Sequence, residues 1–75
     1  MSRLNEIRNR RRLPAREVCR AVRLSAGITQ AAVARACAVN RASVCRWEAG
    51  RRTPRGDHLK AYLAVLNELL GSPDR

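Results

Sequence analysis

The sequence predicts an all-α fold, a compact domain of four or five helices, on three observations. Apolar residues recur every three or four positions, and no segment shows the apolar and polar alternation of a strand. Residues that cap or end helices separate the periodic segments. A chain of 75 residues buries only about 60% of its unfolded surface, so it has room for one small core and not for two domains.

The N-terminal part of the chain divides at Pro14. Residues 1–13 are predicted to be a basic arm or a short helix in which Leu4 and Ile7 share a face. Proline disfavours helix at the preceding residue and suits the first turn of a new one, so a second helix begins here. One apolar stripe is expected on it, made of Ala15, Val18, Cys19, Val22 and Ala26. Gly27 is expected to end this helix in the left-handed conformation.

Two short helices follow, separated by only three residues. Thr29 and Asn40 are residue types that cap helix N-termini, and they predict helices over about 30–37 and 41–49. Six apolar residues are placed to face the interior of such a pair: Val33, Ala34, Cys37, Val39, Val44 and Trp47. Two short helices joined in this way form a helix-turn-helix unit, here over about 30–49, whose second helix lies in the DNA major groove.

A last helix is predicted from Asp57, after a basic loop that begins with the helix-ending Gly50. Gly71 and Pro73 end this helix. Its apolar face comprises Leu59, Tyr62, Leu63, Leu66, Leu69 and Leu70. Such a face is wide for a small core, so it serves either core packing alone or a contact between two copies of the chain. The candidates for the dimer contact are Tyr62, Val65, Leu66 and Leu69.

The net charge of +10 is concentrated in the first three-quarters of the chain. Residues 1–56 hold fourteen arginines against three glutamates, a net charge of +11, whereas residues 57–75 carry −1. A positive surface of this size attracts polyanions such as nucleic acids, anionic lipids or acidic proteins. Composition alone does not choose among these partners.

Other classes of protein are disfavoured by the sequence. No apolar run approaches the roughly 20 residues that span a bilayer, so we expect no membrane contact and a cytoplasmic location. Three cysteines without a CxxC pair predict neither a disulfide framework nor a metal site. Without a phosphate-binding loop or paired carboxylates, we expect no enzyme, no cofactor and no small-molecule ligand.

The second helix of the helix-turn-helix unit has an unusual outward face. Ala42, Cys45 and Ala49 centre that face at 100° per residue, and Arg41 and Arg46 lie on its two edges. Small residues let a helix lie deep in a groove, where Arg donates two hydrogen bonds to guanine and Ala or Cys contacts a thymine methyl group. The alternative is a generic packing unit with a basic face.

These residues resemble the phage Cro and repressor type of helix-turn-helix regulator, the XRE family. The resemblance covers about residues 14–66 and rests on Arg23, Gly27-Ile28-Thr29-Gln30, Val33-Ala34, Val39, Ser43-Val44, Arg46-Trp47-Glu48, Gly50 and Pro54. It implies a five-helix, lambda-repressor-like domain that usually binds double-stranded DNA as a homodimer on a palindromic operator. The expected organisation is then an arm or helix over 1–13, the DNA-binding domain over 14–70 and a tail over 71–75.

The resemblance also implies roles for individual residues. Those implied to contact bases are Arg41, Ala42, Cys45 and Arg46, and those implied to contact phosphates are Gln30, Asn40, Ser43, Arg51 and Arg52. Arg23 and Glu48 are implied to form a partly buried salt bridge. The chain departs from the family at Ala38, where glycine is usual and a left-handed backbone would cost roughly 1 kcal/mol. It also has arginine at base-facing positions that are often Gln or Asn.

The sequence therefore predicts a sequence-specific transcription regulator of repressor or Cro type, acting at the nucleoid or in a phage-infected bacterial cell. Two alternatives are an antitoxin-type interaction module that regulates its own synthesis, and a recombination accessory factor that bends DNA. The N-terminal arginines are Arg8, Arg10, Arg11 and Arg12. They either contact the minor groove or flanking phosphates, or form the solvated end of a short helix.

Overall fold

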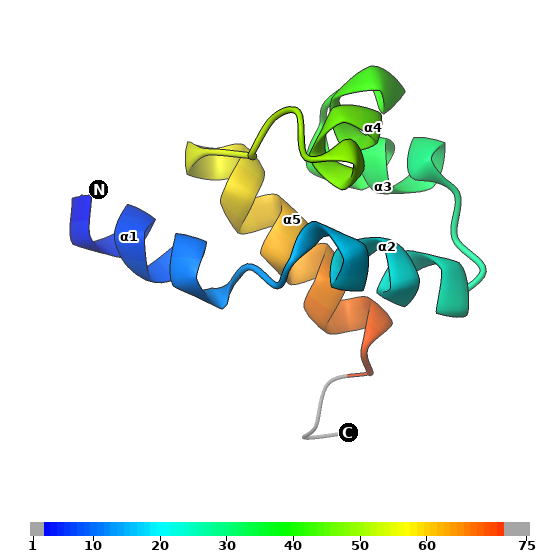
Figure 1. Cartoon of the computed structure of the whole chain (residues 1–75), viewed down its shortest axis with the longest axis horizontal. Helices are drawn as coiled ribbons and strands as arrows, with labels where there is room; N and C mark the ends of the chain where they lie inside the picture. The colour runs from blue at the N-terminus through cyan, green and yellow to red at the C-terminus, as the bar shows by residue number, and fades with distance from the viewer. Residues whose placement is uncertain (1–2, 72–75) are drawn as a thin grey trace.

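The computed structural model describes residues 3–71, and within them it has five helices and no strand (Figure 1). The helices are α1 (Arg3–Arg12), α2 (Arg16–Ser25), α3 (Gln30–Cys37), α4 (Arg41–Ala49) and α5 (Gly56–Leu69). The all-α prediction is confirmed. The N-terminal segment, which the sequence left as an arm or a helix, is a helix from its third residue. Residues 72–75 of the expected tail lie outside the described residues.

Helix α5 runs through the middle of the molecule, and α1, α2 and α3 all contact it (Figure 1). α3 and α4 pack closely on each other, and α2 contacts α4 as well. The buried apolar residues come from the last four helices: Cys19, Val33, Ala34, Cys37, Val44, Trp47, Leu59, Tyr62 and Leu66. The rings of Trp47 and Tyr62 meet at the centre of this core, with centroids 4.8 Å apart. Trp47 is therefore a core residue, as the angle calculation predicted.

Side-chain caps set the starts of both helices in the helix-turn-helix unit. Thr29 Oγ1 accepts a hydrogen bond from the N–H of Ala32 at 3.0 Å, which begins α3. Asn40 Oδ1 accepts one from the N–H of Ser43 at 2.9 Å, which begins α4. Gly50 follows the end of α4 in the left-handed conformation. These caps were predicted from residue type and are confirmed.

The turn between α3 and α4 is tight and strained at one residue. Ala38 has φ 60° and ψ 40°, the only positive φ of a non-glycine residue in the described part of the chain. Hydrogen bonds fix the turn, because the N–H of Ala38 donates to Arg35 O and that of Val39 donates to Ala34 O. The half-buried Val39 then packs against the core. Packing thus holds an alanine in a conformation that favours glycine.

The buried face of α2 is rotated from the expected apolar stripe. Val18 is 48% exposed, whereas Arg23 is only 8% exposed and lies beside the buried Cys19 on the inner face. Ala15 and Ala26 are exposed and lie outside the helix. The prediction is confirmed for Cys19, which is buried, and for Val22, which packs half-buried against the core, and it is wrong for the other three residues.

Two of the four dimer candidates on α5 are also corrected. Tyr62 is 3% and Leu66 4% exposed in the single chain, because both fill the core between α5 and the helix-turn-helix unit. Their side chains cannot contact a second copy without unpacking that core. Val65 and Leu69 are half-buried, and Leu70, just past the helix, is 62% exposed. The helix itself begins at Gly56, one residue before the predicted start.

Candidate nucleic-acid interface

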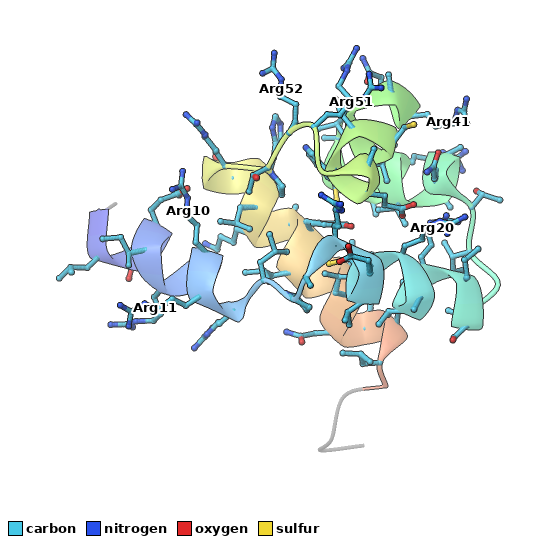
Figure 2. All side chains as sticks on the ribbon, viewed as in Figure 1. Arg10, Arg11, Arg20, Arg41, Arg51 and Arg52 are labelled. Atoms are coloured by element: carbon cyan, nitrogen blue, oxygen red, sulfur yellow. The ribbon has the colours of Figure 1, made fainter. Side chains whose placement is uncertain are left out.

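Helix α4 buries one face and leaves the opposite face open. Val44 is fully buried and Trp47 nearly so, which fixes the rotation of the helix about its axis. On the opposite side the exposed residues are Arg41, Ala42, Cys45, Arg46 and Ala49. The structure therefore brings the four expected base-contacting residues together on one solvent-facing surface. In Figure 2, Arg41 points outward from the end of the molecule where α4 lies.

A basic cleft lies between α4 and the loop that follows it. Its volume is about 780 Å³, and it runs from the turn before α4 to the first turn of α5. Four arginines line it: Arg46, Arg51, Arg52 and Arg55. None of the four has a carboxylate within salt-bridge distance among residues 3–71. Unpaired guanidinium groups around a cleft attract phosphates, with which Arg forms bidentate hydrogen bonds.

The loop that carries Arg51, Arg52 and Arg55 is held in place at its start. The N–H groups of Arg51 and Arg52 both point to the carbonyl oxygen of Arg46, at 2.9 and 3.4 Å. Pro54 is buried and anchors the other side of the loop. Figure 2 shows Arg51 and Arg52 pointing outward on the same side of the molecule as α4.

Arg16 of α2 closes over the end of α4, a contact that the sequence analysis missed. Gly50 has φ 77°, and a Cβ added there would overlap the guanidinium end of the Arg16 side chain. The left-handed backbone is what favours glycine here, because the flexible end of the Arg16 side chain could move aside. The sequence shows an arginine at the start of α2, but no local pattern indicates that it contacts a residue 34 positions away.

A buried ion pair joins α2 to α4. Arg23 Nε donates to Glu48 Oε2 at 2.6 Å and Nη2 donates to Oε1 at 3.0 Å, so the pair is bidentate. Arg23 Nη1 also donates to the carbonyl oxygen of Ile28 at 2.8 Å. Both side chains are nearly buried, at 10% and 4% exposed. This is the salt bridge that the family resemblance implies.

Opposing effects act on the pKa of Glu48. Burial raises it, because it penalises the charged carboxylate, while hydrogen bonds from Arg23 and Gln30 lower it. The hydrogen bonds, helped by the charge of Arg23, prevail, so the pKa of Glu48 lies below its ordinary value. The carboxylate is thus held charged in the folded protein.

Gln30 links the Arg23–Glu48 ion pair to Arg41, the first residue of α4. Its Nε2 donates to Glu48 Oε1 at 3.0 Å, and its Oε1 accepts from Arg41 Nη1 at 3.4 Å. A polar chain therefore runs from Arg23 through Glu48 and Gln30 to Arg41, across three helices. The sequence suggested a phosphate contact for Gln30 and gave no sign of this link. Arg41 thus has a weak hydrogen-bond partner on α3.

The remaining expected site residues lie at the start of α4 and on α1. Asn40 Oδ1 accepts from both the N–H and the hydroxyl of Ser43, at 2.9 and 3.1 Å, so these two side chains cap the helix together. The N-terminal arginines are all exposed on α1: Arg8, Arg10, Arg11 and Arg12. The described residues contain no group of three or more His, Cys, Asp or Glu placed to hold a metal ion. Among these residues there is also no helix long and apolar enough to span a membrane.

The fold and this surface define a helix-turn-helix DNA-binding protein, in which α3 and α4 form the helix-turn-helix unit. The chain belongs to the helix-turn-helix family, because the model of that family matches residues 20–70, more than half of its length. It is a DNA-binding regulator of the XRE type. No curated protein and no solved structure matches the chain.

Proposed function

We propose that this protein is a sequence-specific transcription regulator of the phage repressor or Cro type, which binds a palindromic operator as a homodimer inside a bacterial cell. The observation that carries the proposal is the exposed face of α4, where small side chains lie between Arg41 and Arg46. A solvated helix usually carries alternating Glu and Lys on such a face. A face of small residues and arginines is better suited to contact with the DNA major groove than to exposure to solvent.

Base recognition is assigned to four residues of α4. Arg41 and Arg46 donate to guanine O6 and N7, while Ala42 and Cys45 contact thymine methyl groups. All four side chains are exposed in the free chain. Each half of the operator then contains at least one G·C pair. The hydrogen bond between Arg41 and Gln30 is weak at 3.4 Å, so Arg41 can exchange it for a base.

Phosphate contacts are assigned to the residues around the recognition helix: Gln30, Asn40, Ser43, Arg51 and Arg52. The two arginines follow α4 directly and line the cleft beside it. Contacts of this kind fix the register of the protein on the duplex without reading its sequence. Asn40 and Ser43 lie at the N-terminus of α4, where the helix dipole and free N–H groups favour a phosphate.

The dimer contact is assigned to the C-terminal half of α5, with a second copy of the chain as its partner. Val65 and Leu69 are half-buried there and Leu70 is exposed, so part of their apolar surface is free for a partner. Residues 57–75 carry a net charge of −1, whereas the rest of the chain carries +11. Two copies therefore repel each other least at this end.

Selection of binding sites from random duplex DNA tests this proposal. We expect an inverted repeat with a G·C pair in each half-site and with half-sites about one helical turn apart. Recovery of no consensus at physiological salt, with equal binding to all duplexes, would instead identify a binder of DNA charge or shape.

A further inference from the structure

Helix α1 lies before the residues that match the family, and it is attached to the start of α5. The carboxylate of Glu6 accepts from the N–H of Gly56, at 3.2 Å for Oε1 and 3.3 Å for Oε2. The same Oε2 lies 3.6 Å from Arg10 Nε. Gly56 directly follows the basic loop that ends at Arg55. Glu6 thus attaches α1 to the residue that follows the basic loop, and Arg10 lies one helical turn from that contact.

The composition of α1 argues against a main role in the core. Its apolar residues Leu4 and Ile7 are 69% and 45% exposed, so the helix buries little hydrophobic surface. Its other exposed side chains include four arginines: Arg8, Arg10, Arg11 and Arg12. Among these four, the described residues provide a salt-bridge partner only for Arg10. That pair is long, at 3.6 Å, and partly exposed, so it is weak and Arg10 can exchange it for a phosphate. Charge is therefore the main property that this helix adds to the molecule.

The arginines of α1 point to different sides of the molecule. In Figure 2, Arg10 points to the side on which Arg51 and Arg52 lie, whereas Arg11 points to the opposite side. Arg10 therefore adds a positive charge on the side of the molecule that carries Arg51 and Arg52, whereas Arg11 does not.

We propose that α1 is a second DNA-contacting element, in which Arg10 binds a phosphate of the duplex outside the half-site read by α4. The ligand is the phosphodiester backbone of the flanking DNA, and the contact is independent of base sequence. Because α1 is a helix fixed to α5 by Glu6, it lies against the backbone instead of entering the minor groove as an extended arm. This inference rests on the proposed function, since it takes the groove position of α4 as given.

The test compares two duplexes and two variants by fluorescence anisotropy. One duplex ends at the outer edges of the selected operator, and the other extends it by about five base pairs on each side. Arg10→Gln and Arg11→Gln remove the same charge from the same helix, so Arg11→Gln is the matched control. Circular dichroism and a thermal melt check that both variants fold like the unmodified chain.

We expect the unmodified chain and Arg11→Gln to bind the extended duplex more tightly than the short one, and Arg10→Gln to lose that gain. At about 0.15 M salt, each lost phosphate contact reduces affinity about fivefold and lowers the slope of log affinity against log salt by about 0.9. Equal losses in the two variants, or an unchanged gain in Arg10→Gln, would overturn the role of Arg10. Failure of the unmodified chain to prefer the operator over a scrambled duplex would instead contradict the proposed function.

Discussion

Arg23 on α2 and Glu48 on α4 form a bidentate ion pair, with Nε to Oε2 at 2.6 Å and Nη2 to Oε1 at 3.0 Å. The pair is nearly buried, and Gln30 forms hydrogen bonds with both Glu48 and Arg41. A residue on α2 is thus connected through hydrogen bonds to the surface that we assign to base recognition. Its contribution to stability can be separated from its contribution to binding.

Removing one partner of this pair is expected to destabilise the fold strongly. Arg23→Met or Glu48→Leu leaves the other charge buried and uncompensated, which costs about 3–5 kcal/mol of unfolding free energy. The double variant Arg23→Met with Glu48→Leu buries no charge, so it is expected to be more stable than either single variant. Urea denaturation measures all three. Additive losses in the double variant would show that the pair is not coupled.

The pH dependence of stability is expected to follow Glu48. Its pKa is lowered in the folded chain, so the carboxylate stabilises the fold above its unfolded pKa, and this stability is lost as the pH falls through the folded value. Stability should therefore decline below a pH of about 4.5, the ordinary pKa of a glutamate. Glu48→Gln is expected to be less stable near neutral pH and to show a shallower acid decline. An acid decline of the same steepness in both proteins would assign it to other carboxylates.

Relief of the strained turn is expected to stabilise the protein. Ala38→Gly removes the cost of a left-handed alanine and should raise the unfolding free energy by up to about 1 kcal/mol. The matched control is Ala36→Gly, at an exposed position within α3, which should lower it by about 0.5–1 kcal/mol. Thermal and urea unfolding measure both changes. Destabilisation by Ala38→Gly would contradict the strained conformation.

The dimer proposal predicts a specific surface effect. Leu70→Lys places a charge at the exposed end of α5 and is expected to weaken self-association at micromolar concentration. Leu24→Lys makes the same change at an exposed leucine of α2, and it should leave self-association unaltered. Sedimentation velocity distinguishes monomer from dimer in each case. A purely monomeric unmodified chain, with no dimer on palindromic DNA, would contradict this assignment.

Local chemistry explains which features could be predicted from the sequence. The starts of α3 and α4 follow from Thr29 and Asn40, because a cap acts within three residues of the chain. The inward positions of Val44 and Trp47 follow from helical periodicity. These rules suffice to find the helix-turn-helix unit and the open face of its second helix.

Contacts between residues far apart in the sequence explain the features that could not be predicted. The inner position of Arg23 on α2 depends on Glu48, which lies 25 positions away, so apolar spacing does not predict it. The place of α1 depends on Glu6 and Gly56, which lie 50 positions apart. Nothing within a single helix marks either partner. Tyr62 and Leu66 were wrongly expected to contact a second copy for a related reason. Helical periodicity shows that they lie on an apolar face, but not whether that face packs in the core or against another chain.

The most direct test of the account compares the base preferences of Arg46→Ala and Arg52→Ala by selection from random DNA. Arg46 is assigned to a base, so its loss should remove the preference at one position of each half-site, worth about 1–3 kcal/mol, and leave the other positions unchanged. Arg52 is assigned to a phosphate, so its loss should weaken binding to every sequence evenly and flatten the salt dependence. Even, unspecific weakening in both variants would contradict the assignment of α4 as the helix that reads the operator.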